Sequence, residues 1–263
     1  MRPYLPLLAY VLTTSASAVV IRHDVPDAKY RNAPSEARAL INLAHEGHGV
    51  LIAPQWVLTA AHATQWHPVT EVMVGERCVK VAQLIVHPGY RKLPDELIKG
   101  DAAPAMAHLT QSDDVALIKL AEPVRDVQPL ALYDRQDEVG KSVRIFGMGA
   151  TGNGKDGQQG PNRTQLRQAY NRIDGADPRY LAYTFDSDAS AHALEGMAGN
   201  GDSGGPVLIE DAGQWKVAGL TSYTYGTGSF SAYKPGIYGI SSRAVRVSHY
   251  LPWIRQTIAA EMR

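Results

Sequence analysis

Residues 201–206 read Gly-Asp-Ser-Gly-Gly-Pro, and the segments Thr59-Ala60-Ala61-His62 and Asp113-Asp114-Val115-Ala116-Leu117 lie upstream of them. A serine hydroxyl is a poor nucleophile at neutral pH unless an imidazole takes its proton and fixed N–H groups hold the oxyanion that forms. Glycines beside Ser203 allow the sharp backbone turn that points amides outward. We therefore predict a catalytic site made of Ser203, His62 and one carboxylate of the Asp113-Asp114 pair.

The bulk composition narrows the class of protein. The chain has 263 residues, no formal net charge at pH 7 and a pI near 7.1. This length is enough for one large β domain or two small ones. Without a basic stripe or an acidic run, the sequence argues against a nucleic-acid partner and against a charged tail.

The first 18 residues carry the three parts of a secretory signal peptide. Arg2 is the charged start, Leu5–Leu12 is an apolar run too short to span a bilayer, and Ala16-Ser17-Ala18 is a small-residue cleavage site. We predict cleavage after Ala18 and a secreted or periplasmic protein with no membrane span. The alternative is an N-terminal hydrophobic strand.

Short β-rich runs separated by turn residues recur along the chain, which favours barrels or a sandwich. They cover 49–52, 56–59, 71–74, 79–86, 116–120, 142–146, 166–173, 206–210, 215–222 and 236–240. Two prolines make Glu122–Pro129 a candidate linker, and apolar residues three or four apart predict an amphipathic helix over 248–262.

The three motifs resemble those of the trypsin/chymotrypsin-type serine proteases, which share the chain order His, Asp, Ser. The likeness runs from about Val19 to the C-terminus and is weak across 91–112 and 150–195. It implies an all-β fold of two packed antiparallel six-stranded β-barrels with a C-terminal α-helix. The expected bounds are about 30–125 for barrel one, 126–247 for barrel two and 248–262 for the helix.

The resemblance also assigns the catalytic roles. His62 and Asp114 would come from the first barrel and Ser203 from the second. Asp114 is selected because the family aspartate precedes an apolar run, so that Asp113 is expected to be a solvated loop carboxylate. The backbone N–H groups of Gly201 and Ser203 would form the oxyanion hole.

Substrate-binding positions follow from the same likeness. Ser222, Tyr223 and Thr224 would pair with the substrate backbone as an added strand, and Ser222 either donates to Asp114 or is an ordinary strand serine. Met197, six residues before Ser203, would form the floor of the primary pocket, or it fills the core as methionine usually does. Gly236 would leave one pocket wall open. An uncharged floor predicts cleavage after neutral, small or medium apolar residues.

Asp202 is expected to be a buried carboxylate, which needs a partner. In the family this partner is the ammonium of the mature N-terminus, and cleavage after Ala18 would supply one at Val19. A side-chain cation, or further trimming of the chain, would be the alternative.

The single cysteine, Cys78, cannot form an internal disulfide, and its alternating context predicts a buried thiol. The family places a cysteine after the catalytic histidine and its partner on the preceding strand. Those positions are expected at Ala63 and His48.

Two further motifs fail their structural requirements. Residues 147–152 match a dinucleotide-binding fingerprint, but glycines and polar residues follow where a helix is needed. His45-Glu46-Gly47-His48 is one residue too short for a helical zinc motif. We therefore expect no cofactor and no metal.

The sequence predicts an exported serine endopeptidase, expected to be a monomer, acting on protein or peptide substrates. The alternatives are a catalytically silent homologue that binds proteins and an esterase.

Overall fold

The fold was described from a computed structural model, which covers residues 19–162 and 165–261. The predicted signal peptide therefore lies outside the described residues. The strands and helices of the first half, in chain order, are β1 (Val19–Ile21), β2 (Leu40–Leu43), β3 (His48–Ala53), β4 (Trp56–Thr59), β5 (Glu71–Val74), β6 (Arg77–Val86), α1 (Ala103–Leu109) and β7 (Ala116–Leu120).

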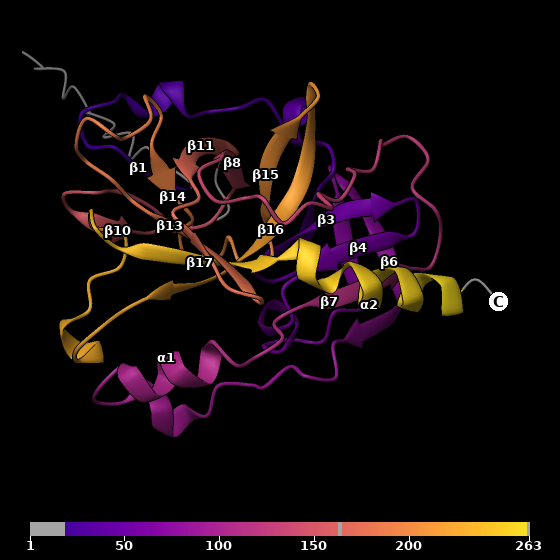
Figure 1. The fold of residues 1–263 in the computed structure, drawn as a ribbon. Coiled ribbons are helices and arrows are strands. Elements are labelled where there is room, and N and C mark those ends of the chain that lie inside the picture. The colour runs from indigo at the N-terminus through magenta and orange to yellow at the C-terminus, as the bar shows by residue number, and fades with distance from the viewer. Residues whose placement is uncertain (1–18, 163–164, 262–263) are drawn as a thin grey trace, which may run out of the picture.

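The second half, in the same order, contains β8 (Ser142–Gly147), β9 (Thr151–Asn153), β10 (Gly157–Gln159), β11 (Arg167–Arg172), β12 (Gly175–Ala176), β13 (Tyr180–Thr184), β14 (Gly196–Met197), β15 (Pro206–Asp211), β16 (Gln214–Tyr225), β17 (Ser241–Arg246) and α2 (Val247–Ala260). Figure 1 shows the two halves side by side, with α2 returning across the first.

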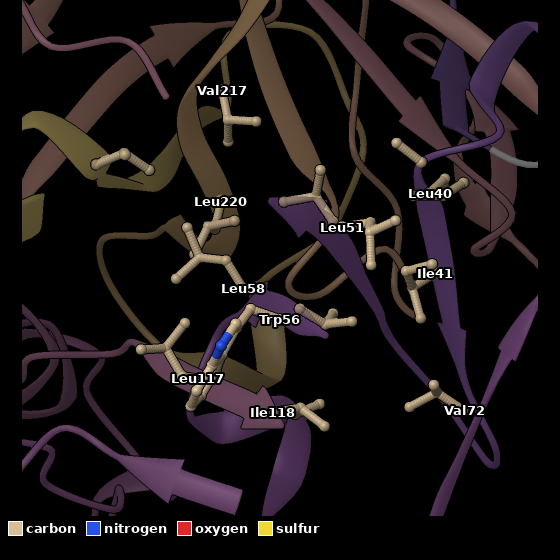
Figure 2. Packing of buried hydrophobic residues seen from close by; sticks show 14 of the residues in the cluster. Leu40, Ile41, Leu51, Trp56, Leu58, Val72, Leu117, Ile118, Val217 and Leu220 are labelled. Carbon is tan, nitrogen blue, oxygen red and sulfur yellow. The ribbon is translucent and has the colours of Figure 1, made fainter. Parts of the chain in front are cut away.

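The first half is a closed six-stranded barrel with the strand order β2-β3-β4-β7-β6-β5. Alternate residues of each strand face inward because successive side chains of a strand point to opposite faces. Leu51 and Ile118 lie on one face of the β3-β4-β7 ladder, and Leu58 and Leu117 lie on the opposite face. All four are fully buried in one cluster, and Figure 2 shows Leu58 beside Leu220 of β16. Apolar burial of this kind stabilises the barrel by about 25 cal/mol per Å² of covered surface.

The second half is an open seven-stranded sheet with the order β11-β8-β15-β16-β17-β13-β12. The all-β fold with a C-terminal helix is confirmed, but this sheet is not closed by a hydrogen-bonded ladder as the second barrel was expected to be. The outer edge of β11 bonds elsewhere: Gln168 N donates to Tyr30 O, and Tyr170 N donates to Leu194 O. These segments occupy the edge at which a closing strand would have to pair.

A small separate sheet, ordered β10-β9-β1-β14, joins the start of the described chain to the second half. Val19 pairs in parallel with Thr151, and Val20 pairs antiparallel with Met197. Both valines are fully buried. The segment after residue 18 therefore starts with an internal strand.

Helix α2 packs on the first barrel although it follows the last strand of the second half. Tyr250, Leu251 and Ile254 belong to the same buried cluster as Leu117 of β7. Lys119 Nζ also lies 3.0 Å from the Glu261 carboxylate beyond the helix end. This return of the chain fastens the two halves together. No helix in residues 19–162 and 165–261 has the length and apolar character needed to cross a membrane.

Three local expectations were wrong. Gly236–Ile240, expected as a strand, forms turns, and the strand begins at Ser241. Cys78 is exposed, because β6 turns Val79 into the barrel and leaves its neighbour outside. Gly47, and not His48, faces Ala63: a β-carbon on Gly47 would lie 3.2 Å from that of Ala63.

Candidate active site

Three side chains from distant segments form one hydrogen-bonded chain. His62 begins the 3-10 turn after β4, Asp114 lies two residues before β7, and Ser203 lies in the loop between β14 and β15. His62 Nε2 lies 2.8 Å from Ser203 Oγ, and His62 Nδ1 lies 2.7 Å from Asp114 Oδ2. An ionised carboxylate can only accept, so Nδ1 carries the proton and Nε2 is free to accept from the serine.

Asp114 is held by a full set of donors. It is only 4% exposed, and it accepts from the backbone N–H of His62 at 2.8 Å and from the Ser222 hydroxyl. Burial alone would lower the pKa of His62. The charge and hydrogen bond of Asp114, with a smaller contribution from Glu46, outweigh burial and raise the pKa of the imidazole. The arrangement therefore favours a base that accepts a proton readily.

The loop that carries Ser203 depends on glycines. Gly201 has φ +95°, a left-handed conformation that other residues rarely adopt. At Gly204 a β-carbon would lie 2.2 Å from Thr59 Oγ1 and 2.3 Å from His48 O. Within the described part of the chain, the backbone N–H groups of Gly201 and Ser203 donate to no protein acceptor. The serine thus has two unpaired amides close to its hydroxyl group, its own and that of Gly201.

Asp202 is fully buried beneath this loop. Its carboxylate accepts from Gly149 N at 2.6 Å and from Gly199 N at 2.9 Å. The ring of His48 is also buried, with Nε2 3.5 Å from Asp202 Oδ1. That nitrogen accepts from Met148 N at 3.2 Å, so the ring of His48 supports the loop by a hydrogen bond.

Asp113 is not the solvated carboxylate that was expected. It is 14% exposed and accepts from Arg179 Nε and from the Tyr250 hydroxyl, each at 2.8 Å. These partners come from the turn before β13 and from α2, segments far away in the sequence. Asp113 therefore ties the loop before β7 to the second half of the molecule.

The predicted primary-pocket residues line one small cavity beside Ser203, of about 60 Å³. Met197 is fully buried and lines it together with Thr224 and Gly236. The strand residue opposite Thr224 is Ser242, which also lines the cavity and was not identified from the sequence.

A second cavity, of about 280 Å³, lies on the same side of Ser203 and shares residues 222–224 with the first. Its apolar wall comes from a segment where the sequence resemblance was weak. Met106 and Leu109 of α1 contribute to it together with Leu93 and Trp66. The α1 segment is fastened by hydrogen bonds between Ala102 N and Gly228 O and between Phe230 N and Gly100 O.

Comparisons with known proteins identify the family and the fold. A model of the trypsin family matches residues 28–254. Trypsin II-P29 of chicken (Gallus gallus) is 29% identical over 225 residues, covering 81% of this chain and 79% of that relative. The solved structure of neuropsin, a serine protease expressed in the limbic system of mouse brain, aligns with a TM-score of 0.64 at 21% identity. That alignment covers 87% of this chain and 98% of the neuropsin chain, and it shows the likeness of fold.

Proposed function

The chain belongs to the trypsin family and is a serine-type endopeptidase, and we propose that it cleaves peptide bonds with Ser203, His62 and Asp114 as its catalytic triad. One observation carries this proposal: the continuous hydrogen-bonded path from Ser203 Oγ through the His62 ring to the Asp114 carboxylate. The raised pKa of His62 supports its role as the proton acceptor.

The reaction proceeds by acyl transfer. Ser203 Oγ attacks the scissile carbonyl carbon while its proton passes to His62 Nε2, and the carbonyl electrons become an oxyanion. The N–H groups of Gly201 and Ser203 donate to this oxygen. Asp114 keeps Nδ1 protonated and stabilises the imidazolium.

Breakdown of the tetrahedral intermediate completes the first half of the reaction. His62 returns the proton to the leaving amine, the C–N bond breaks, and an acyl-enzyme remains on Ser203. Water then attacks the ester, with His62 first accepting its proton and then returning one to Ser203. The product acid leaves and the free serine is restored.

The acyl side of the substrate binds along Ser222, Tyr223 and Thr224, which lie at the end of β16 nearest to Ser203. An extended peptide adds to this edge by main-chain hydrogen bonds. The small volume of the cavity lined by Met197 supports cleavage after small residues, and the sequence predicts that these are neutral or apolar. The neighbouring cavity with the α1 wall would accept an apolar side chain further along the acyl part.

Export is part of the proposal. Removal of residues 1–18 would leave an ammonium group at Val19. Val19 pairs with Thr151, which lies only two residues after Gly149 in the chain. Gly149 N is bonded to Asp202, so the new charge would arise close to the buried carboxylate. Edman sequencing of the active enzyme tests this: a first residue well past Val20 would reject it.

Activity itself is tested by fluorophosphonate labelling and by peptide hydrolysis. We expect labelling of the mature wild-type protein, cleavage of casein, and loss of both in Ser203→Ala. A folded wild-type protein that takes no label would be a catalytically silent homologue. Labelling with ester hydrolysis but no peptide cleavage would identify an esterase.

A further inference from the structure

Glu46 places an acidic group beside the nucleophile. It lies on the turn between β2 and β3, and its Oε1 accepts from Asn162 Nδ2 at 3.2 Å. In the described part of the chain, no lysine or arginine lies within ion-pair distance of this carboxylate. Oε2 makes no hydrogen bond with these residues, so the carboxylate keeps a free oxygen beside Gly201.

The position of Glu46 relative to Ser203 fixes which part of a substrate it meets. The turn that carries it abuts Ser203, since His48 N donates to Ser203 O at 2.7 Å. A β-carbon on Gly201 would lie 2.8 Å from Asn162 Nδ2 and 3.3 Å from Glu46 Oε1. The Glu46–Asn162 pair therefore borders Gly201, whose amide is proposed to hold the oxyanion.

Neither cavity on the acyl side of Ser203 is lined by Glu46. The acyl part of a substrate runs along residues 222–224, and the chain continues past Ser203 in the other direction. The residues that follow the scissile bond must leave along the side where the β2–β3 turn and Asn162 lie. Glu46 also acts electrostatically on His62, the group that protonates the leaving amine.

We propose that Glu46 is a specificity-determining residue on the leaving-group side, which selects lysine or arginine at the first or second position after the scissile bond. This inference rests on the proposed function. The attraction energy between a carboxylate and a cation a few ångströms away is larger at a partly open site than in bulk water, because the effective dielectric constant is lower. A glutamate at the same substrate position is repelled, and a neutral residue gains nothing. Asn162 holds one carboxylate oxygen, which fixes the group while leaving the other for the substrate.

The test uses the mature enzyme and internally quenched peptides that share one acyl part. The residue at each of the two positions is varied among Lys, Arg, Ala and Glu, and kcat/KM is measured at low and at high salt. We expect Lys or Arg to exceed Ala by about tenfold at one of the two positions, and Glu to fall below Ala. The preference should shrink at high salt because screening weakens the attraction.

Substitutions separate the side chain from the general field of the protein. In Glu46→Gln the kcat/KM values of the four peptides should agree to within about twofold. In Glu46→Lys the peptide with Glu should become the best substrate and those with Lys or Arg the poorest. Glu210→Gln, which removes an exposed carboxylate of β15, should keep the wild-type order. Circular dichroism and thermal unfolding establish that each variant is folded.

Two results would overturn the inference while leaving the proposed function standing. One is that the wild-type enzyme cleaves all four peptides with kcat/KM values within twofold of each other. The other is that the preference for Lys or Arg survives Glu46→Gln unchanged. If Glu46→Gln fails to fold, the salt series on the wild-type enzyme decides, because a salt-insensitive preference is not electrostatic. A wild-type enzyme that takes no fluorophosphonate and cleaves no peptide overturns the proposed function and this inference together.

Discussion

Asp114→Asn should remove most of the activity while leaving the fold intact. In the wild-type protein, Oδ1 accepts the backbone N–H of His62 at 2.8 Å, and Oδ2 accepts from His62 Nδ1 at 2.7 Å and from Ser222. The backbone N–H can only donate, so the oxygen of the new amide must stay on that side. Its NH2 group then faces the imidazole.

The consequence is an inverted tautomer. An NH2 group can only donate, so Nδ1 must accept and the ring proton moves to Nε2. Nε2 then has no lone pair for the proton of Ser203. The wrong tautomer in such a triad lowers kcat by about 10⁴-fold. The pKa of His62 should also fall, because burial lowers it once the charge of Asp114 is gone.

Asp113→Asn is the matched control, because it changes the adjacent residue in the same way. Its oxygen can still accept from Arg179 and Tyr250, so we expect a loss of stability and less than a tenfold loss of kcat. Peptide hydrolysis as a function of pH and the rate of fluorophosphonate labelling measure both variants. If Asp114→Asn stays within tenfold of wild type, or if Asp113→Asn is the more damaging change, the assignment is refuted.

Three further changes test separate features. Gly201→Ala should lower kcat by about 10²–10³-fold with a small change in melting temperature, because a side chain at φ +95° disturbs one proposed oxyanion donor; unchanged kcat would contradict this. Burial raises the pKa of Glu195 from 4.5 to about 7, because the folded protein favours the protonated carboxyl group. The stability of the fold is therefore unaffected by this group below pH 4.5, and it falls as the pH rises from 4.5 through about 7, because the carboxyl group ionises first in the unfolded chain. Glu195→Gln should therefore stabilise the protein by up to about 3 kcal/mol at alkaline pH and much less under acid conditions, measured by denaturant unfolding; an equal effect at both would reject the idea. Exposed Cys78 should react with a thiol reagent in the native protein without loss of peptidase activity, although its hydrogen bond with Glu71 raises the pKa of the thiol and slows the reaction near neutral pH; protection until unfolding would show that it is buried.

Much of the fold could be read from local sequence patterns. The β-rich runs at 56–59 and 116–120 correspond to β4 and β7, and the helical period in 248–262 corresponds to α2. Strand β2 and helix α1 were missed because their sequences are short and carry weak periodicity. The open second sheet could not be foreseen, since it depends on which segment reaches the edge of β11.

The sequence alone singled out His62, Ser203 and the Asp113-Asp114 pair, because a reactive serine and its base need a distinctive local context, and the resemblance to the protease family selected Asp114. The structure then brings His62, Asp114 and Ser203 within hydrogen-bond distance. The tertiary structure decided what local context cannot encode: Ser242 opposite Thr224, the buried contacts of Asp113, and Glu46 beside the nucleophile. Each of these depends on segments that are far apart in the chain and meet only when the two halves pack together. A residue's own neighbours in sequence fix its conformation, whereas its charge environment and its partners are fixed by whatever the rest of the fold places against it.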